Sequence, residues 1–289
     1  MNLRSAALGQ VTATRRHSLP VSLWIAIAVL AAWIVVALVG PALAPHGEGQ
    51  VLGNDSFAPP GAFGLLGSDY LGRDLWSRLL FGARRTLGLA AIVAMLAFTI
   101  GVGAGFLAAI VGGWLDTTLS RLNDALLAFP SLILALIVIA ALGTSVPILV
   151  ATVALIEATR IYRIARALAM DVLVMDFVDA ARARGEGALW IMRSEILPSV
   201  TTPLAAEFGV RYVYAILFIS ALSFLGLGVQ PPGADWGVMV RENLQGLLFG
   251  SFAPVIPAAA IASVTVAINL MVDWWSQRSG RDLSSEQMP

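Results

Sequence analysis

The chain has 289 residues, of which 58% are hydrophobic and only 12% are charged, and its mean hydropathy is +0.83. A soluble domain carries about 25% charged residues, so this composition excludes an ordinary soluble protein and indicates an integral membrane protein. Acidic and basic residues balance at 18 each, so no excess of positive charge would attract nucleic acid.

The residue types that are missing exclude further classes of protein. All 18 basic residues are arginine, and without the lysine of a phosphate-binding P-loop we expect this chain not to hydrolyse ATP itself. The absence of cysteine excludes disulfides and thiolate-bound zinc. The two histidines, His17 and His46, are too few and too far apart in the sequence for a metal site. We therefore expect no catalytic residue, no metal and no bound cofactor.

The first membrane span is expected at residues 22–44, because a spanning helix needs about 20 apolar residues. Residues 1–21 would then form a short cytoplasmic segment. A secretory signal is the alternative, since Ala42-Leu43-Ala44 resembles a cleavage site. The apolar stretch exceeds the roughly 7 to 15 residues of such signals, and Pro45 should hinder cleavage, so we expect an uncleaved anchor.

Residues 45–85 are expected to form an outer loop that ends in an amphipathic helix at the membrane surface. Ser68 or Asp69 could cap this helix. Asp74 and Arg78 are spaced to pair across one turn, and an apolar stripe would consist of Leu71, Leu75 and Leu79. An ordinary surface helix of a small loop is the alternative that the same spacing allows.

The second span is expected at residues 86–112, and it contains Gly101 and Gly105 four residues apart. Small residues at this spacing allow another helix backbone to approach closely. We interpret the two glycines as a helix-packing site with no further role.

The uncharged stretch 125–156 is too long for one straight crossing, because 32 residues of helix measure about 48 Å. Gly143, Ser145 and Pro147 lie in its middle and favour a turn. We expect a tight outer turn between a third span that starts near Arg121 and a fourth that ends near Arg166.

The fifth and sixth spans are expected at residues 204–229 and 252–272, so the prediction is an all-α membrane protein of about six spanning helices. Residues 86–275 would be the core with five of them, and residues 276–289 a cytoplasmic tail. With both termini inside, thirteen arginines lie on the cytoplasmic side and five outside, as the positive-inside rule requires. Four tryptophans lie at the expected inner ends of spans, namely Trp24, Trp114, Trp274 and Trp275.

The longest polar stretch, residues 160–203, lies on the predicted cytoplasmic side. Asp176 is expected to cap a two-turn helix, with Asp179 completing a capping-box-like start. Gly185 would end the helix in the left-handed conformation, and a second short helix, residues 187–196, would end before Pro198. A slim helix of this kind could enter a groove on another protein, whereas an interfacial hairpin without a partner is the alternative.

Several segments together resemble a known transporter family. The sequence Asp179-Ala180-Ala181, followed by Gly185 and Leu197-Pro198, resembles the EAA loop of ATP-binding cassette (ABC) importer permeases, here residues 170–203. The stretches LGSDYLGRDLWSRLLFGARRTL, DALLAFPSLILAL and LSFLGLGVQPPGADWGVM look like the dipeptide/oligopeptide subfamily, second-subunit type, and follow in family order. Asp179 stands where the family usually has Glu. Glu195 and Ser199 replace its common His and Asn, which weakens any inference about the substrate.

The resemblance implies a type I ABC importer permease in the bacterial inner membrane, which imports di- or oligopeptides or a related small solute. Its partners would be a second permease, two ATPase subunits that bind ATP, a periplasmic binding protein and membrane lipid. The cytoplasmic loop would couple the permease to an ATPase through Asp176, Phe177, Asp179, Ala180, Ala181, Arg184, Gly185, Leu197 and Pro198.

An ion-coupled secondary transporter or a channel-type protein is the competing function. Such transporters place ionisable groups near the centre of the membrane, but no charged residue or histidine falls at the centre of a predicted span. Glu157, Glu207 and Arg211 lie toward the inner halves, and we interpret them as ion pairs between helices. A membrane enzyme is disfavoured because no catalytic or metal-binding spacing is present.

Overall fold

The computed structural model describes residues 20–286. The arginines of the expected N-terminal segment, Arg4, Arg15 and Arg16, and also His17, lie outside the described residues, as do residues 287–289. Within the described part the chain is helical, and its extended pairing is limited to two isolated bridges near the start of α2.

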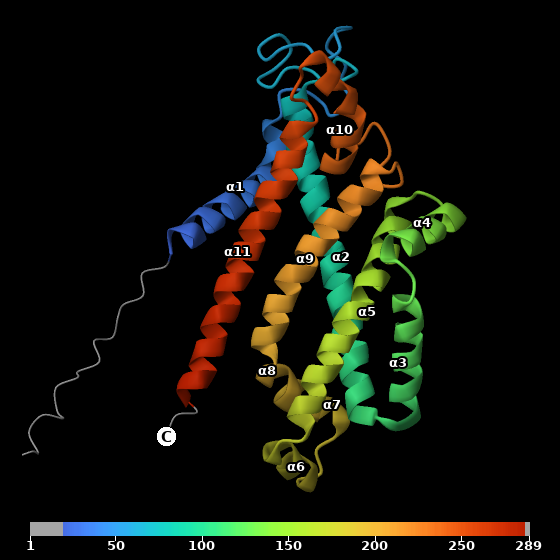
Figure 1. The fold of residues 1–289 in the computed structure, drawn as a ribbon, viewed down its shortest axis with the longest axis vertical. Coiled ribbons are helices and arrows are strands. Elements are labelled where there is room, and N and C mark those ends of the chain that lie inside the picture. Colours follow the sequence, from blue (N-terminus) through green and yellow to red (C-terminus); the bar gives the residue numbers. More distant parts are fainter. Residues whose placement is uncertain (1–19, 287–289) are drawn as a thin grey trace, which may run out of the picture.

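Seven helices build the membrane body (Figure 1): α1 (Val21–Leu43), α2 (Leu75–Val111), α3 (Gly113–Leu127), α4 (Ser131–Leu142), α5 (Val146–Leu173), α9 (Thr201–Phe224) and α11 (Val255–Glu286). Four of them, α1, α2, α9 and α11, are long and apolar enough to cross a membrane. The bent pair α3 and α4 together passes as a fifth. α5 has 28 residues and is long enough, but five of them are charged, so it does not count among these candidate spans. This arrangement is broadly consistent with the six expected helices.

The body is organised around α2 and α5, which lie side by side along the length of the molecule (Figure 1). α1 and α11 lie on one side of this pair, and α3 and α4 lie on the other. The indole of Trp33 on α1 donates a 2.9 Å hydrogen bond to Ser263 on α11. The hydroxyl of Tyr212 on α9 donates to the Leu87 carbonyl of α2 at 3.1 Å. The first contact joins α1 to α11, and the second joins α9 to α2.

The third expected span differs from the prediction because it is broken. It begins at Gly113 rather than near Arg121, and α3 and α4 meet at an angle of 91°. Pro130 lies directly before α4 and lacks the N–H that a continuous helix would need. The expected turn is present, since Gly143 follows α4 with φ of 101° and Pro147 lies at the start of α5. α5 continues beyond Arg166 to Leu173.

The predicted amphipathic helix before the second span is not a separate element. α2 begins at Leu75 and runs without interruption for 37 residues, and Leu71 lies before it. The cap is Asp74, whose carboxylate accepts from the N–H groups of residues 76 and 77, rather than Ser68 or Asp69. This use of Asp74 leaves Arg78 to other partners, so the predicted pair between these two residues does not form.

A buried ion cluster joins the start of α2 to α10 (Trp236–Asn243) at one end of the molecule. Glu242 accepts from Arg73 at 2.9 Å and from Arg78 at 2.8 Å. Asp69 pairs with Arg73 at 2.6 Å and with Arg78 at 3.4 Å. The loop before α2 is held against a segment about 170 residues later, because both arginines are almost fully buried and need these carboxylates.

Candidate functional site

The segment between α5 and α9 forms the end of the molecule opposite the ion cluster (Figure 1). It contains α6 (Asp176–Ala183), α7 (Ala188–Ile191), a π-helical turn (Met192–Ile196) and α8 (Leu197–Ser199). We call residues 174–200 the coupling segment, after the role that the family resemblance implies. It contains all nine coupling residues that the resemblance suggests, whereas residues 170–173 and 201–203 of the expected loop belong to α5 and α9.

The start of α6 differs from the predicted capping box. Met175 takes the extended conformation that precedes a helix, so Asp176 is already the first helical residue and no side chain caps the end. Asp176 and Asp179 both lie in the first turn, where negative charge is favourable beside the helix dipole. Asp179 also pairs with Arg182 at 3.2 Å, although both side chains are exposed.

The end of α6 is a complete Schellman motif, as the glycine predicts. Gly185 has φ of +85°, and its N–H donates to the carbonyl of Arg182 at 2.9 Å. The N–H of Glu186 donates to the carbonyl of Ala181 at 3.2 Å. These two bonds satisfy carbonyls that the helix end would otherwise leave free. The helix therefore stops at a defined residue.

α6 has one buried face and one exposed face. Val178 and Ala181 are fully buried against the basal cluster, which we define as Phe106, Ala165, Ala169, Val172, Val178, Ala181, Ile191, Ile196, Val200 and Leu204. Phe177 is 43% exposed, and Asp176, Asp179 and Ala180 are exposed as well. The coupling segment is thus fixed to α5 and α9 on one side and presents an aromatic ring and two carboxylates on the other.

The predicted second helix does not end before Pro198. α7 continues through the π-helical turn into α8, and Pro198 lies inside α8. The wider turn accommodates the proline, because the N–H of Leu197 donates to the carbonyl of Met192, five residues earlier. Leu197 is 40% exposed and lies with Pro198 where the coupling segment joins α9.

Arg184 connects the two halves of the coupling segment, which the sequence does not reveal. Its guanidinium lies 5.7 Å from the ring centroid of Trp190 and 3.8 Å from the carboxylate of Glu195. The side chain is 53% exposed, so the ion pair is weak. Together with the Schellman motif, these contacts restrain α6 relative to α7.

Gly101 and Gly105 lie where α2 contacts α5. A Cβ atom at Gly101 would lie 2.6 Å from Cβ of Ile161, and one at Gly105 would lie 2.7 Å from the carbonyl oxygen of Tyr162. Gly103, on another face, has open space around it. The close approach depends on the two glycines that the spacing identifies.

Charged residues inside the helical body form ion pairs, as the sequence predicts. Arg211 of α9 contacts Glu157 of α5 at 3.2 Å and Glu207 within α9. Asp116 of α3 pairs with Arg166 of α5 through two hydrogen bonds. The second pair fastens α3 to α5, and the sequence gives no signal for it because 50 residues separate the partners.

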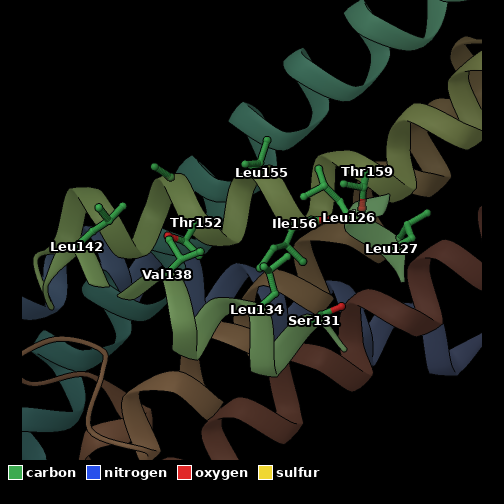
Figure 2. A pocket seen from close by; sticks show the side chains of 11 residues that line it. Leu126, Leu127, Ser131, Leu134, Val138, Leu142, Thr152, Leu155, Ile156 and Thr159 are labelled. Carbon is green, nitrogen blue, oxygen red and sulfur yellow. Dashed lines mark hydrogen bonds between the residues drawn. The ribbon is translucent and has the colours of Figure 1, made fainter. Parts of the chain in front are cut away.

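A cavity of about 230 Å³ lies in the angle between α3, α4 and α5 (Figure 2). Eight aliphatic side chains dominate its wall, and the three hydroxyls of Ser131, Thr152 and Thr159 interrupt it. Figure 2 shows the wall built from all three helices. The cavity could hold an apolar side chain. Among the described residues no group of three His, Cys, Asp or Glu side chains could hold a metal.

Comparison with known proteins extends over most of the chain. Residues 101–285 match the family described as binding-protein-dependent transport system inner membrane component. A putative peptide transport system permease protein of Brucella suis is 39% identical over 75% of this chain and 73% of its own length. The di/tripeptide transport system permease protein of Pseudomonas aeruginosa is 36% identical over 83% and 81%. A glutathione transport system permease protein of Escherichia coli is 32% identical over 83% and 80%.

The fold agrees with these sequence relatives. A solved amino acid ABC transporter chain matches with a TM-score of 0.53 and covers 70% of this chain and 94% of its own length, at 17% identity. This likeness concerns the fold alone. The protein is a non-catalytic membrane subunit, and the ATPase is a separate subunit. The chain therefore belongs to the family of inner membrane components of binding-protein-dependent transport systems.

Proposed function

We propose that this chain is a permease subunit of an ABC importer for short peptides. The relatives carry names for the transport of peptides, di- and tripeptides and glutathione, and glutathione is itself a tripeptide. The observation that carries the proposal is the sequence identity of 36 to 39% over at least three quarters of the chain.

In this proposal the exposed face of α6 docks on an ATPase subunit. Phe177 would enter an apolar cleft, and Asp176 and Asp179 would face positive charge. Arg184 and Gly185 would keep the end of α6 from unravelling, so that a displacement imposed by the ATPase reaches α5 and α9. Leu197 and Pro198 would transmit it at the base of α9. The fully buried Ala181 supports this arrangement by allowing α6 to pack closely on the basal cluster, while the small side chain of Ala180 would admit the partner.

The assembly would contain a second, homologous permease, two ATPase subunits and a periplasmic binding protein, with lipid around the remaining surface. The family description implies a binding protein and an ATPase, and the number of each is part of the proposal. Large apolar side chains that lack cover in the isolated chain, such as Trp114 at 77% and Ile137 at 57% exposure, support an apolar environment of lipid or partner helices.

Both termini and the coupling segment would lie in the cytoplasm. The arginine asymmetry supports this orientation, and the outer arginines that oppose it are largely neutralised. Arg73 and Arg78 belong to the buried ion cluster, and Arg85 pairs with Glu48 at 2.7 Å. The rule counts arginines rather than net charge, and thirteen on the proposed inner side against five outside still favour this orientation.

Affinity purification of the tagged chain in mild detergent, followed by identification of its partners, tests the proposal. We expect two ATPases and a second permease. Vesicles that contain the assembly, with binding protein outside, should take up a dipeptide only when ATP is present inside, because the ATPases would face the interior. Uptake by the purified chain alone, without nucleotide, would instead establish a secondary transporter or a channel.

A further inference from the structure

A continuous chain of polar contacts links α4, α5 and α9 inside the helical body. Glu157 of α5 accepts hydrogen bonds from Arg160 at 2.7 Å and from Arg211 of α9 at 3.2 Å. Arg211 also donates to Glu207, and Arg160 donates to the hydroxyl of Ser131 on α4 at 2.9 Å. We call these five residues the interhelical network.

Stability alone does not explain why the interhelical network is ionic. Its two carboxylates and two guanidiniums carry no net charge, and Glu157 and Arg211 are 3% and 11% exposed at their side chains. Well-packed apolar side chains would stabilise a buried site at least as well as an ion pair does. Ion pairs differ from apolar contacts in that they fix the register of two elements, and charged residues within membrane helices commonly mark function.

The position of the network along the helices shows what it restrains. Leu173 at the end of α5 lies 16 residues beyond Glu157, which is about 24 Å of helix. Arg211 lies ten residues after the start of α9, about 15 Å. Near the coupling segment the same two helices are joined by the basal cluster. The main apolar core also includes buried residues of both helices, among them Ile156 of α5 and Val213 of α9. To these apolar contacts the network adds a directional attachment, which fixes the register of α5 against α9.

The network also reaches the cavity wall. Ser131 is the first residue of α4, which contributes Leu134 and Val138 to the lining of the cavity. Arg160 therefore connects α5 directly to the helix that bounds the cavity. Figure 2 shows Ser131 and Leu134 on this helix, with Thr159 across from them.

We propose that Glu157 and Arg211 are positioning residues that make α5, the coupling segment and α9 move as one body, so that a displacement of α6 is transmitted to α4 and the cavity. This inference rests on the proposed docking of α6 on an ATPase. Neither residue needs to touch the transported solute.

The first test removes one carboxylate and one guanidinium together, so that the net charge of the interhelical network stays at zero. In the complete reconstituted transporter, the double substitution Glu157→Gln with Arg211→Gln should lower solute transported per ATP hydrolysed by about tenfold, within the range for residues that carry coupling between sites. Glu48→Gln with Arg85→Gln is the matched control, because this ion pair lies outside the α5–α9 body. An unchanged ratio in the first variant contradicts the proposal.

A second test replaces the ionic connection by a covalent one. The natural chain contains no cysteine, so Glu157→Cys with Arg211→Cys introduces the only thiols of this chain, and a short bifunctional thiol reagent can join them. We expect a low ratio of transport to ATP hydrolysis before cross-linking, recovery after it, and loss again on reduction of a cleavable reagent. A complete cross-link that leaves the ratio low would show that the connection itself is not what matters.

A third measurement keeps the network intact, so it remains informative if the variants fail to assemble. Spin labels on Leu155→Cys of α5 and Leu217→Cys of α9, both about half exposed, should keep the same separation with and without ATP. A pair on Leu155→Cys and Val266→Cys of α11 should change its separation, because α11 lies outside the moving body. A change in the first pair, or no change in either, contradicts the inference. If the ATPases do not bind the natural chain, the proposed function fails instead.

Discussion

The φ angle of +85° at Gly185 allows a sharp test of the rigid end of α6. An L-amino acid in the left-handed region costs about 1–2 kcal/mol, and a β-branched residue is at the unfavourable end of that range. A Cβ atom at Gly185 would meet no other atom within 4 Å, so no steric clash adds to this cost. The full effect of Gly185→Val is therefore on the backbone.

A cost of about 1–2 kcal/mol shifts the balance between a stopped and an unravelled helix end by roughly 5- to 30-fold. We expect Gly185→Val to insert normally into the membrane and to bind ATP-hydrolysing partners, but to transport several-fold less solute per ATP. The assay measures peptide uptake and phosphate release from the same reconstituted vesicles. Asparagine tolerates the left-handed conformation better than valine, so Gly185→Asn should give an intermediate ratio.

Gly187 provides the matched control for the same substitution. Its φ of −78° is ordinary for any residue, and a Cβ atom there would also meet nothing within 4 Å. Gly187→Val therefore adds the same side chain two residues later without the conformational cost. Equal ratios of transport to ATP hydrolysis in the two valine variants would refute the reasoning, because the backbone conformation is what separates them.

Three further changes follow from the structure. Gly101→Ala should destabilise the protein by about 1–3 kcal/mol through overpacking, measured by thermal unfolding in detergent, while Gly103→Ala should have little effect because its Cβ has open space. Asp179→Lys should weaken co-purification with the ATPases, since it places a cation at the positive end of α6, and undiminished co-purification contradicts this. Burial raises the pKa of Glu48, but its arginine partner and a backbone N–H outweigh it, so the folded-state pKa is below the usual value of 4.5. The ionised Glu48 therefore stabilises the fold fully above pH 4.5, and this stabilisation is lost as the pH falls through the lower, folded-state pKa. Glu48→Gln should remove this pH dependence of the melting temperature, and an unchanged dependence would contradict the prediction.

The parts of the fold that could be predicted depend on residues close together in the sequence. The stop at Gly185, the turn around Gly143 and the close approach at Gly101 follow from one residue type and its immediate neighbours. The predicted start of α6 is one position too late, since Met175 and not Asp176 precedes the helix. No side-chain hydrogen bond caps this end, so the sequence pattern does not decide between the two residues. Local signals thus locate helix ends without fixing the terminal residue.

The ion cluster and the break between α3 and α4 could not be predicted, because they depend on distant partners. Arg78 is four residues from Asp74, which favours a local pair, yet it binds Glu242. Asp74 instead caps the N-terminus of α2. The folded chain supplies Arg78 with another carboxylate, that of Glu242, which lies 164 residues after Arg78. Pro130 indicates a possible break, but the 91° angle depends on how α4 packs against α5.

If transported peptides pass the cavity between α3, α4 and α5, its wall also bears on where they are selected. Its wall contains aliphatic side chains and three hydroxyls and no charged residue. The terminal amine and carboxylate, which all linear peptides share, would find no opposite charge there, and the aliphatic wall has little power to distinguish one apolar side chain from another. We therefore expect substitutions such as Thr152→Val to change the rate of peptide uptake without changing which peptides are taken up. A change in peptide preference by this variant, measured by competition between unlabelled peptides, would place selection in the permease itself.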